Sequence, residues 1–79
     1  MNQNNLAWIS HRWQRDTRYY EVHLKQDLFG WVLIQNWGGI ENRSGQQKTN
    51  PVAGYQDGLV KMEQIFKKRK QRRYQLCHY

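Results

Sequence analysis

A short run near the C-terminus concentrates the side chains best suited to binding a polyanion. Six of its seven positions are cations: Lys67, Lys68, Arg69, Lys70, Arg72 and Arg73. Ammonium and guanidinium groups neutralise phosphates, so this basic cluster predicts contact with nucleic acid first and with an anionic membrane surface second. The alternative is that the cations stabilise the C-terminus of a helix and keep a small domain soluble. Six cations exceed what those two roles require.

The remainder of the chain is close to neutral. The sequence has 79 residues and a formal net charge of +7, from 13 Lys and Arg against 6 Asp and Glu. Seven cations lie outside the basic cluster, facing the six acids. This asymmetry is typical of a protein with a polyanionic partner.

Trp37, followed by Gly38 and Gly39, is a second candidate for binding. A large ring beside two glycines is either a core side chain at a bend of a sheet or a flat stacking surface. Aromatic and basic residues also mix near the N-terminus, at Trp8, His11, Arg12, Trp13, Arg18 and Tyr19. They predict either a stacking surface for bases or half-buried positions of a strand.

The sequence contains no clear motif for metal binding or for catalysis. The residues His11, His23, Cys77 and His78 lack the paired spacing of a zinc site. The sequence has no glycine-rich phosphate loop with its lysine, and no nucleophile with a base and an orienting residue can be nominated. We therefore expect no enzymatic activity, no cofactor, no metal and no small-molecule substrate.

The single cysteine, Cys77, excludes an internal disulfide and fits a reducing compartment. The first ten residues lack the basic and apolar segments of a secretion signal, and no apolar run reaches transmembrane length. We expect a cytoplasmic protein without a membrane partner, associated with the nucleoid if its ligand is DNA.

Alternation of apolar and polar residues predicts strands over residues 7–14 and 19–26, joined by a polar turn. In the second strand, Tyr20, Val22 and Leu24 share one face.

A hairpin over residues 27–30 leads into residues 31–40, where the apolar run Trp31–Ile34 predicts a strand buried on both faces and central in the sheet. A turn over residues 42–46 and a weaker, polar strand over 47–50 follow, and Pro51 is expected to end that strand.

The spacing of the apolar residues changes after Gly54, from the alternation typical of a strand to the three- and four-residue steps typical of a helix. These apolar residues form one stripe of a helix, which predicts that this face packs on the sheet. The stripe consists of Tyr55, Leu59, Met62 and Phe66, with Ile65 beside it. Gly54 is the expected N-cap, and Asp57 is expected to favour the helix dipole and reach back toward the cap.

The basic cluster continues the helix or frays from it, and alternation over residues 74–79 predicts a short last strand. Strands followed by one helix predict an α+β fold, a small twisted antiparallel sheet with one C-terminal helix packed on one face. We expect a single domain over residues 1–79 with its core at about 7–76.

The order of these segments resembles the WGR domain family. The resemblance covers residues 18–74 and rests on T-R-Y-Y-E-V-H-L-K-Q-D, then W-V-L-I-Q-N-W-G-G-I, a Gly-containing turn and a helix that ends in basic residues. In DNA-damage-activated poly(ADP-ribose) polymerases, a domain of this family contacts DNA near breaks and passes that contact to a separate catalytic domain. Small bacterial proteins of the family consist of little else, and this chain resembles those.

By position, Trp37 matches the motif Trp and Gly38 the motif Gly. The resemblance implies that Trp37 packs against a sugar or base at the nucleic-acid surface. Gly39 stands where the motif has Arg, which puts in doubt the backbone or interdomain contact that this Arg makes in the polymerases. Arg43 and Lys48, on the following turn and strand, are the candidates to replace it.

The sequence therefore predicts a non-enzymatic nucleic-acid-binding module, with DNA favoured over RNA. Phosphate contacts come from the basic cluster, and Trp37 adds a packing contact. The alternative is a protein–protein interaction module or small regulator that docks a partner through its aromatic sheet face. In that case the basic cluster serves solubility or an acidic partner.

Overall fold

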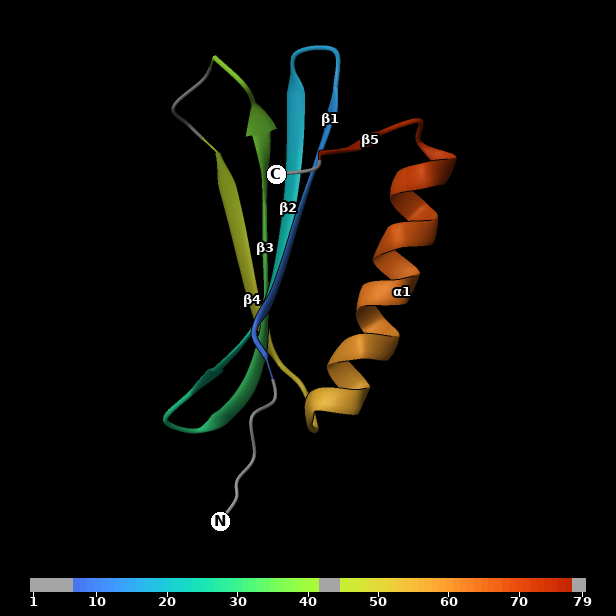
Figure 1. The fold of residues 1–79 in the computed structure, drawn as a ribbon. Helices are drawn as coiled ribbons and strands as arrows, with labels where there is room; N and C mark the ends of the chain where they lie inside the picture. The colour runs from blue at the N-terminus through green and yellow to red at the C-terminus, as the bar shows by residue number, and fades with distance from the viewer. Residues whose placement is uncertain (1–6, 42–44, 78–79) are drawn as a thin grey trace.

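A computed structural model describes residues 7–41 and 45–77, which form an antiparallel sheet with one helix beside it (Figure 1). The elements are β1 Ile9–Arg15, β2 Arg18–Asp27, β3 Gly30–Gly39, β4 Gln46–Pro51, α1 Tyr55–Gln71 and β5 Gln75–Cys77. The predicted α+β fold class, with one C-terminal helix on one face, is confirmed.

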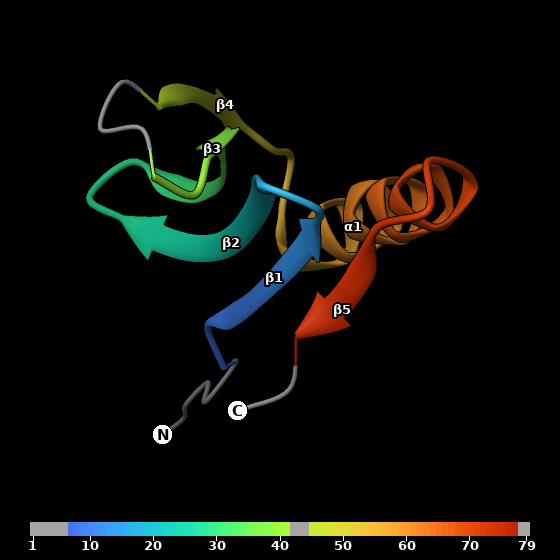
Figure 2. The ribbon, with the colours of Figure 1, turned by 90° about the horizontal axis from the view of Figure 1, so that it is seen from above.

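The five strands lie in the order β4-β3-β2-β1-β5, so the last strand pairs with the first. Seen from above, the sheet is strongly twisted and α1 runs along one side of it (Figure 2). The predicted strand over residues 31–40 is present as β3 and lies inside the sheet, between β2 and β4, but the prediction that it is buried on both faces is wrong. The middle strand is β2, and Leu33 is the one buried residue of β3. Because a single helix covers one face, Val32 and Ile34 on the other face stay half-buried.

The core lies between the sheet and α1. Its fully buried members are Trp13, Val22, Leu24, Leu33 and Met62. Around them pack half-buried apolar residues, which include the predicted helix-stripe residues other than the buried Met62: Ile9, Tyr20, Trp31, Val52, Tyr55, Leu59, Ile65, Phe66, Tyr74 and Leu76. The predicted inward faces of β2 and α1 are thus confirmed.

The start of α1 follows the prediction. Gly54 is the N-cap residue, and the Asp57 carboxylate accepts a hydrogen bond of 3.0 Å from the backbone N–H of Ala53. This hydrogen bond lowers the pKa of Asp57 below its ordinary value. The carboxylate also lies 3.4 Å from Lys61 Nζ, one turn along the helix.

Gly58 lets the helix approach the sheet closely. A Cβ atom at this position would lie 2.5 Å from Cδ1 of Leu24, whose side chain is completely buried. Gly58 weakens the helix by about 1 kcal/mol relative to Ala. Its place in the sequence is therefore explained by packing against β2 rather than by helix propensity.

The C-terminus of α1 closes with a left-handed residue, Arg73, at φ 64°. The N–H of Arg73 donates to the Lys70 carbonyl and that of Tyr74 to the Arg69 carbonyl, both at 3.0 Å. This is the Schellman pattern, in which glycine usually takes the left-handed position. The turn directs the chain into β5, where Leu76 pairs with Trp13 of β1.

Candidate functional site

A groove of about 550 Å³ opens between the C-terminal half of α1 and the helix-facing side of the sheet. Its lining residues come from every element except β5: Arg15, Arg18, Tyr20, Gln35, Trp37, Lys48, Lys68, Arg69, Arg72 and Tyr74. A second hollow of about 430 Å³ extends it along α1 and β4 and shares Tyr20, Gln35, Lys48, Lys68 and Arg69. We call the two together the basic groove.

The groove collects cations from distant parts of the sequence. The larger hollow is lined by six Lys and Arg residues, three from the strands and three from the end of α1, and the second hollow adds Lys61. No Asp or Glu occurs among the described residues that line either hollow. Such a concentration of one charge between low-dielectric walls attracts anions strongly.

Arg69 is the unusual member of this set, because only 8% of it is exposed. Its guanidinium lies 4.1 Å from the ring centre of Tyr20 and 4.9 Å from that of Tyr74. Its Nε is buried without a hydrogen-bond partner. Ring faces attract a cation but do not neutralise it, so the groove contains a buried positive charge that no carboxylate of residues 7–41 and 45–77 balances.

One wall of the groove is an aromatic stack. The rings of Tyr20 and Trp37, cross-strand partners on β2 and β3, lie nearly parallel, 6.0 Å apart and at 16°. The Tyr20 hydroxyl donates to the side-chain oxygen of Gln35. Burial raises the pKa of Tyr20, and the nearby charge of Arg69 opposes that shift. Tyr20 thus keeps its proton at neutral pH and holds Trp37 in place.

Arg15 connects the end of β1 to the end of the helix. Its Nη1 donates a hydrogen bond of 2.7 Å to the carbonyl of Arg72, and its guanidinium lies 5.8 Å from the ring centre of Tyr74. The carbonyls of the last helical turn have no partner within the helix, so a cation here stabilises the helix end. The rim of the groove is fixed by this contact.

The predicted site residues fall into several groups. Trp37, Lys48, Lys68, Arg69 and Arg72 line the basic groove.

Lys67 and Lys70 lie on the opposite flank of α1, beside an apolar pocket, and Lys67 pairs with Glu63 at 3.4 Å. Arg73 is exposed at the helix end, and Arg43 lies outside the described residues.

The two glycines of the motif region lie at the end of β3. Gly39 pairs with Arg18 of β2. Gly38 pairs with Tyr19, and a Cβ there would come within 3.1 Å of the backbone of Gly45. The absence of a side chain at Gly38 therefore serves close packing against the segment that returns to β4.

Sequence reasoning missed Arg15 entirely and named Arg18 only among the mixed aromatic and basic residues. Neither residue stands out by spacing, since only strand pairing brings them to the helix end. The burial of Arg69 had a signal, because Met62, Phe66 and Arg69 continue the 4-3 spacing of the buried helix stripe.

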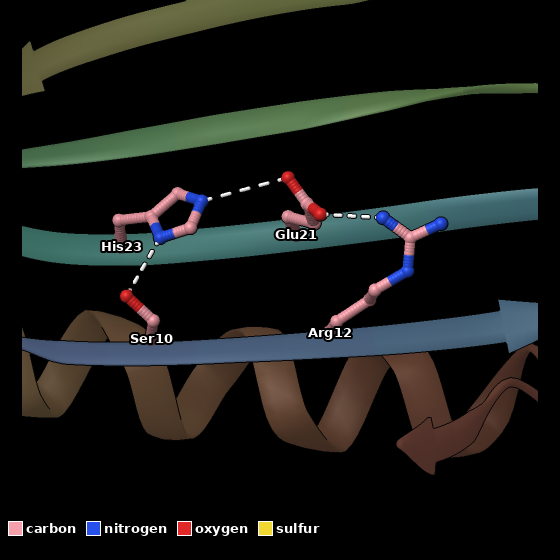
Figure 3. A network of polar contacts seen from close by, with 4 residues as sticks. All are labelled: Ser10, Arg12, Glu21 and His23. Carbon is pink, nitrogen blue, oxygen red and sulfur yellow. Dashed lines mark hydrogen bonds and ion pairs between the residues drawn. The ribbon is translucent and has the colours of Figure 1, made fainter. Parts of the chain in front are cut away.

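The outer face of the sheet carries a separate polar network (Figure 3). Ser10 Oγ lies 2.7 Å from His23 Nδ1, while His23 Nε2 lies 3.6 Å from the carboxylate of Glu21. Glu21 also pairs with Arg12 at 2.5 Å. Although a Ser–His–acid order suggests acyl transfer, these groups lie on an open strand surface and Arg12 neutralises the acid. The network is best explained as cross-strand pairing of polar side chains.

No helix within residues 7–41 and 45–77 is long and apolar enough to cross a membrane. In the same part of the chain, no three His, Cys, Asp or Glu side chains gather where they would hold a metal ion. A protein-family model described as "WGR domain" matches residues 7–77. No curated protein and no solved structure matches the chain.

Proposed function

The chain belongs to the WGR domain family, and from this premise we propose that it is a non-enzymatic DNA-binding module whose ligand lies in the basic groove. In poly(ADP-ribose) polymerase-like proteins the WGR domain is a nucleic-acid-binding module, and DNA is favoured over RNA by that kinship. The observation that carries the proposal is the cluster of cations around the Tyr20–Trp37 stack, with no Asp or Glu among the described residues that line it.

The groove supplies the two kinds of contact that nucleic acid requires. Cations neutralise phosphates and release counterions, which makes affinity depend steeply on salt. If all six cations of the larger hollow contact phosphates of a duplex, log K falls against log salt with a slope of about −5. Trp37, held by Tyr20, offers an apolar surface for a sugar or base beside them.

Arg18 takes over the position of the missing motif arginine in this proposal. It is the cross-strand partner of Gly39, so the two positions share one face of the sheet, and it lines the groove. Lys48, which was a candidate from the sequence, lines the groove from β4. A cation therefore stands next to the site where family members carry theirs.

A matched pair of charge reversals tests the proposal. Lys68 and Lys67 are adjacent in sequence and exposed, but Lys68 lines the groove and Lys67 lies on the other flank of α1. We expect Lys68→Glu to weaken duplex binding at least about tenfold and to make the salt slope shallower by about 1 or more. Lys67→Glu, with the same change in net charge, should weaken binding less than about threefold.

Fluorescence anisotropy provides the measurement, with labelled duplex DNA, nicked duplex, single-stranded DNA and duplex RNA at several salt concentrations. Equal losses in both variants would mean that net charge, not the groove, governs binding. Absence of binding to all four ligands at about 50 mM salt, where such contacts are strong, would overturn the proposal. The protein–protein interaction module would then be the better hypothesis.

A further inference from the structure

The hairpin between β2 and β3 presents two large apolar side chains to solvent. Leu28 is 97% exposed and Phe29 96% exposed, so neither contributes to the core. The turn is held by the Asp27 carboxylate, which accepts a hydrogen bond of 2.8 Å from the N–H of Phe29. Single exposed apolar residues are common, but an adjacent pair on a held turn is typical of a contact surface.

A matching apolar pocket lies on the flank of α1 that faces away from the basic groove. It has a volume of about 280 Å³ and lies between the end of α1 and β5, lined by Trp13, Phe66, Lys67, Lys70, Tyr74 and Leu76. The aromatic and aliphatic side chains are members of the core cluster, while both lysines are exposed. An apolar side chain entering here would meet apolar surface beneath a positively charged rim.

The β2–β3 hairpin lies at one end of the molecule, and the end of α1 with β5, whose residues line the pocket, lies at the other (Figure 1). Trp31, just after the tip, packs on Tyr55 at the start of α1, with ring centres 4.8 Å apart. The pocket lies at the other end of the same helix, and the molecule measures 45 Å along its longest axis. The tip therefore cannot reach the pocket of its own chain.

Charge favours a second copy as the occupant of the pocket. Asp27 places a carboxylate beside the two apolar side chains of the tip, and the pocket rim offers the ammonium groups of Lys67 and Lys70. The same carboxylate would repel the phosphates of nucleic acid or of an anionic membrane. Of the neighbouring charges, Lys25 lies 5.7 Å from the ring centre of Trp8, and Glu63 pairs with Lys67 at the pocket rim.

We propose that the protein self-associates head to tail, with Leu28 and Phe29 of one copy inserted into the apolar pocket of the next. The contact joins two different surfaces, so a row of copies keeps a free tip at one end and a free pocket at the other, and the assembly stays open unless a ring closes. The basic groove opens on the other flank of α1, and Tyr74 is the one described residue that lines both it and the pocket. The cations of the groove therefore remain accessible in every copy. This association requires no nucleic acid.

Sedimentation equilibrium of the full chain without nucleic acid tests the contact. The chain has a mass of 9.7 kDa, and the weight-average mass should rise with concentration past that of a dimer. A contact made by two inserted side chains implies a dissociation constant on the order of 0.1–1 mM. The measurements therefore need protein concentrations up to about 1 mM. Phe29→Ser and Lys70→Glu should each raise the dissociation constant at least about tenfold. Lys68→Glu, the matched control in the groove, should leave it unchanged.

Mixing the two deficient variants distinguishes this contact from a symmetric one. The Phe29→Ser chain keeps its pocket and the Lys70→Glu chain keeps its tip, so an equimolar mixture should form dimers and nothing larger. A wild-type chain that is monomeric at about 1 mM would overturn the proposal. So would undiminished association of the Lys70→Glu chain, because the tips would then pair with each other. Impaired duplex binding by a monomeric Phe29→Ser chain would assign the tip to nucleic acid instead.

Discussion

Replacing Arg69 by Met separates a binding role from a structural one. Met keeps an apolar side chain at this position but removes the guanidinium, which lies over the rings of Tyr20 and Tyr74. Two cation–π contacts are lost, at up to about 2 kcal/mol each because the guanidinium is desolvated. In return, the buried Nε–H without a partner disappears, and such a group costs about 1–3 kcal/mol.

These opposing contributions are similar in size, because removing the guanidinium also relieves the cost of keeping a charge desolvated. We expect the free energy of unfolding to stay within about 1 kcal/mol of wild type or to rise, as when buried charges are exchanged for apolar side chains of similar size. Affinity for duplex DNA should fall about 10- to 100-fold, the value of a charge-assisted hydrogen bond to phosphate. The domain would thus lose its ligand without losing its fold.

Urea denaturation followed by circular dichroism, together with anisotropy titrations, measures both quantities. A loss of more than about 2 kcal/mol would refute the reasoning, and in a domain of this size it corresponds to a drop in Tm of about 8 °C or more. Arg69 would then be a structural residue that the two rings stabilise. Unchanged affinity for DNA in a stable Arg69→Met chain would equally contradict the proposed site.

Three further substitutions test the close packing of α1 on the sheet, the protonation of His11 and the use of the motif position at Gly39. Gly58→Ala should destabilise the domain by about 1–2 kcal/mol in urea denaturation, since overpacking against Leu24 outweighs the gain in helix propensity; increased stability would refute the close approach. Burial lowers the pKa of His11 from 6.5, so the unfolded chain binds the proton more readily, and stability present above about pH 6.5 is lost as pH falls toward the lowered pKa. His11→Phe should therefore reduce the difference in Tm between about pH 7.5 and 5.5, and an equal difference would exclude His11 as its source. Gly39→Arg should strengthen duplex binding about 3- to 10-fold if the motif position beside Arg18 is used, and titration of both chains at one salt concentration checks this.

The elements were predictable where the local pattern and the tertiary environment agree. Alternation around Val22 and Leu24 and the stripe through Met62 were correct because one face of each element meets the core. The apolar run from Trp31 to Ile34 led to the wrong prediction of burial on both faces, because apolar composition does not tell how many layers cover a strand. In the part of the chain that the structure describes, one helix accompanies five strands, and this ratio decides that the outer face of the strand stays open.

The candidate site was only partly predictable, for a related reason. Lys68 and Arg72 were found by their density in the sequence. Arg15 and Arg18 reach the groove only because the β1–β2 turn brings both beside the end of α1, and this depends on how the helix docks. The density of cations in the sequence could not show that Lys67 lies on the other flank of α1 from Lys68. The two differ because successive residues of a helix point in different directions.

Because β5 pairs with β1, the sheet cannot be completed on the ribosome until the end of the domain has been synthesised. Residues 16–74 lie between the two strands, and at about 5–20 residues per second their synthesis takes roughly 3–12 s. During that interval the edge of β1 that later pairs with β5 has no strand to pair with, although β2 is already available on its other side. The nascent chain therefore exposes an unpaired strand edge until its last elements emerge, and it is in this interval that aggregation or a chaperone competes with folding.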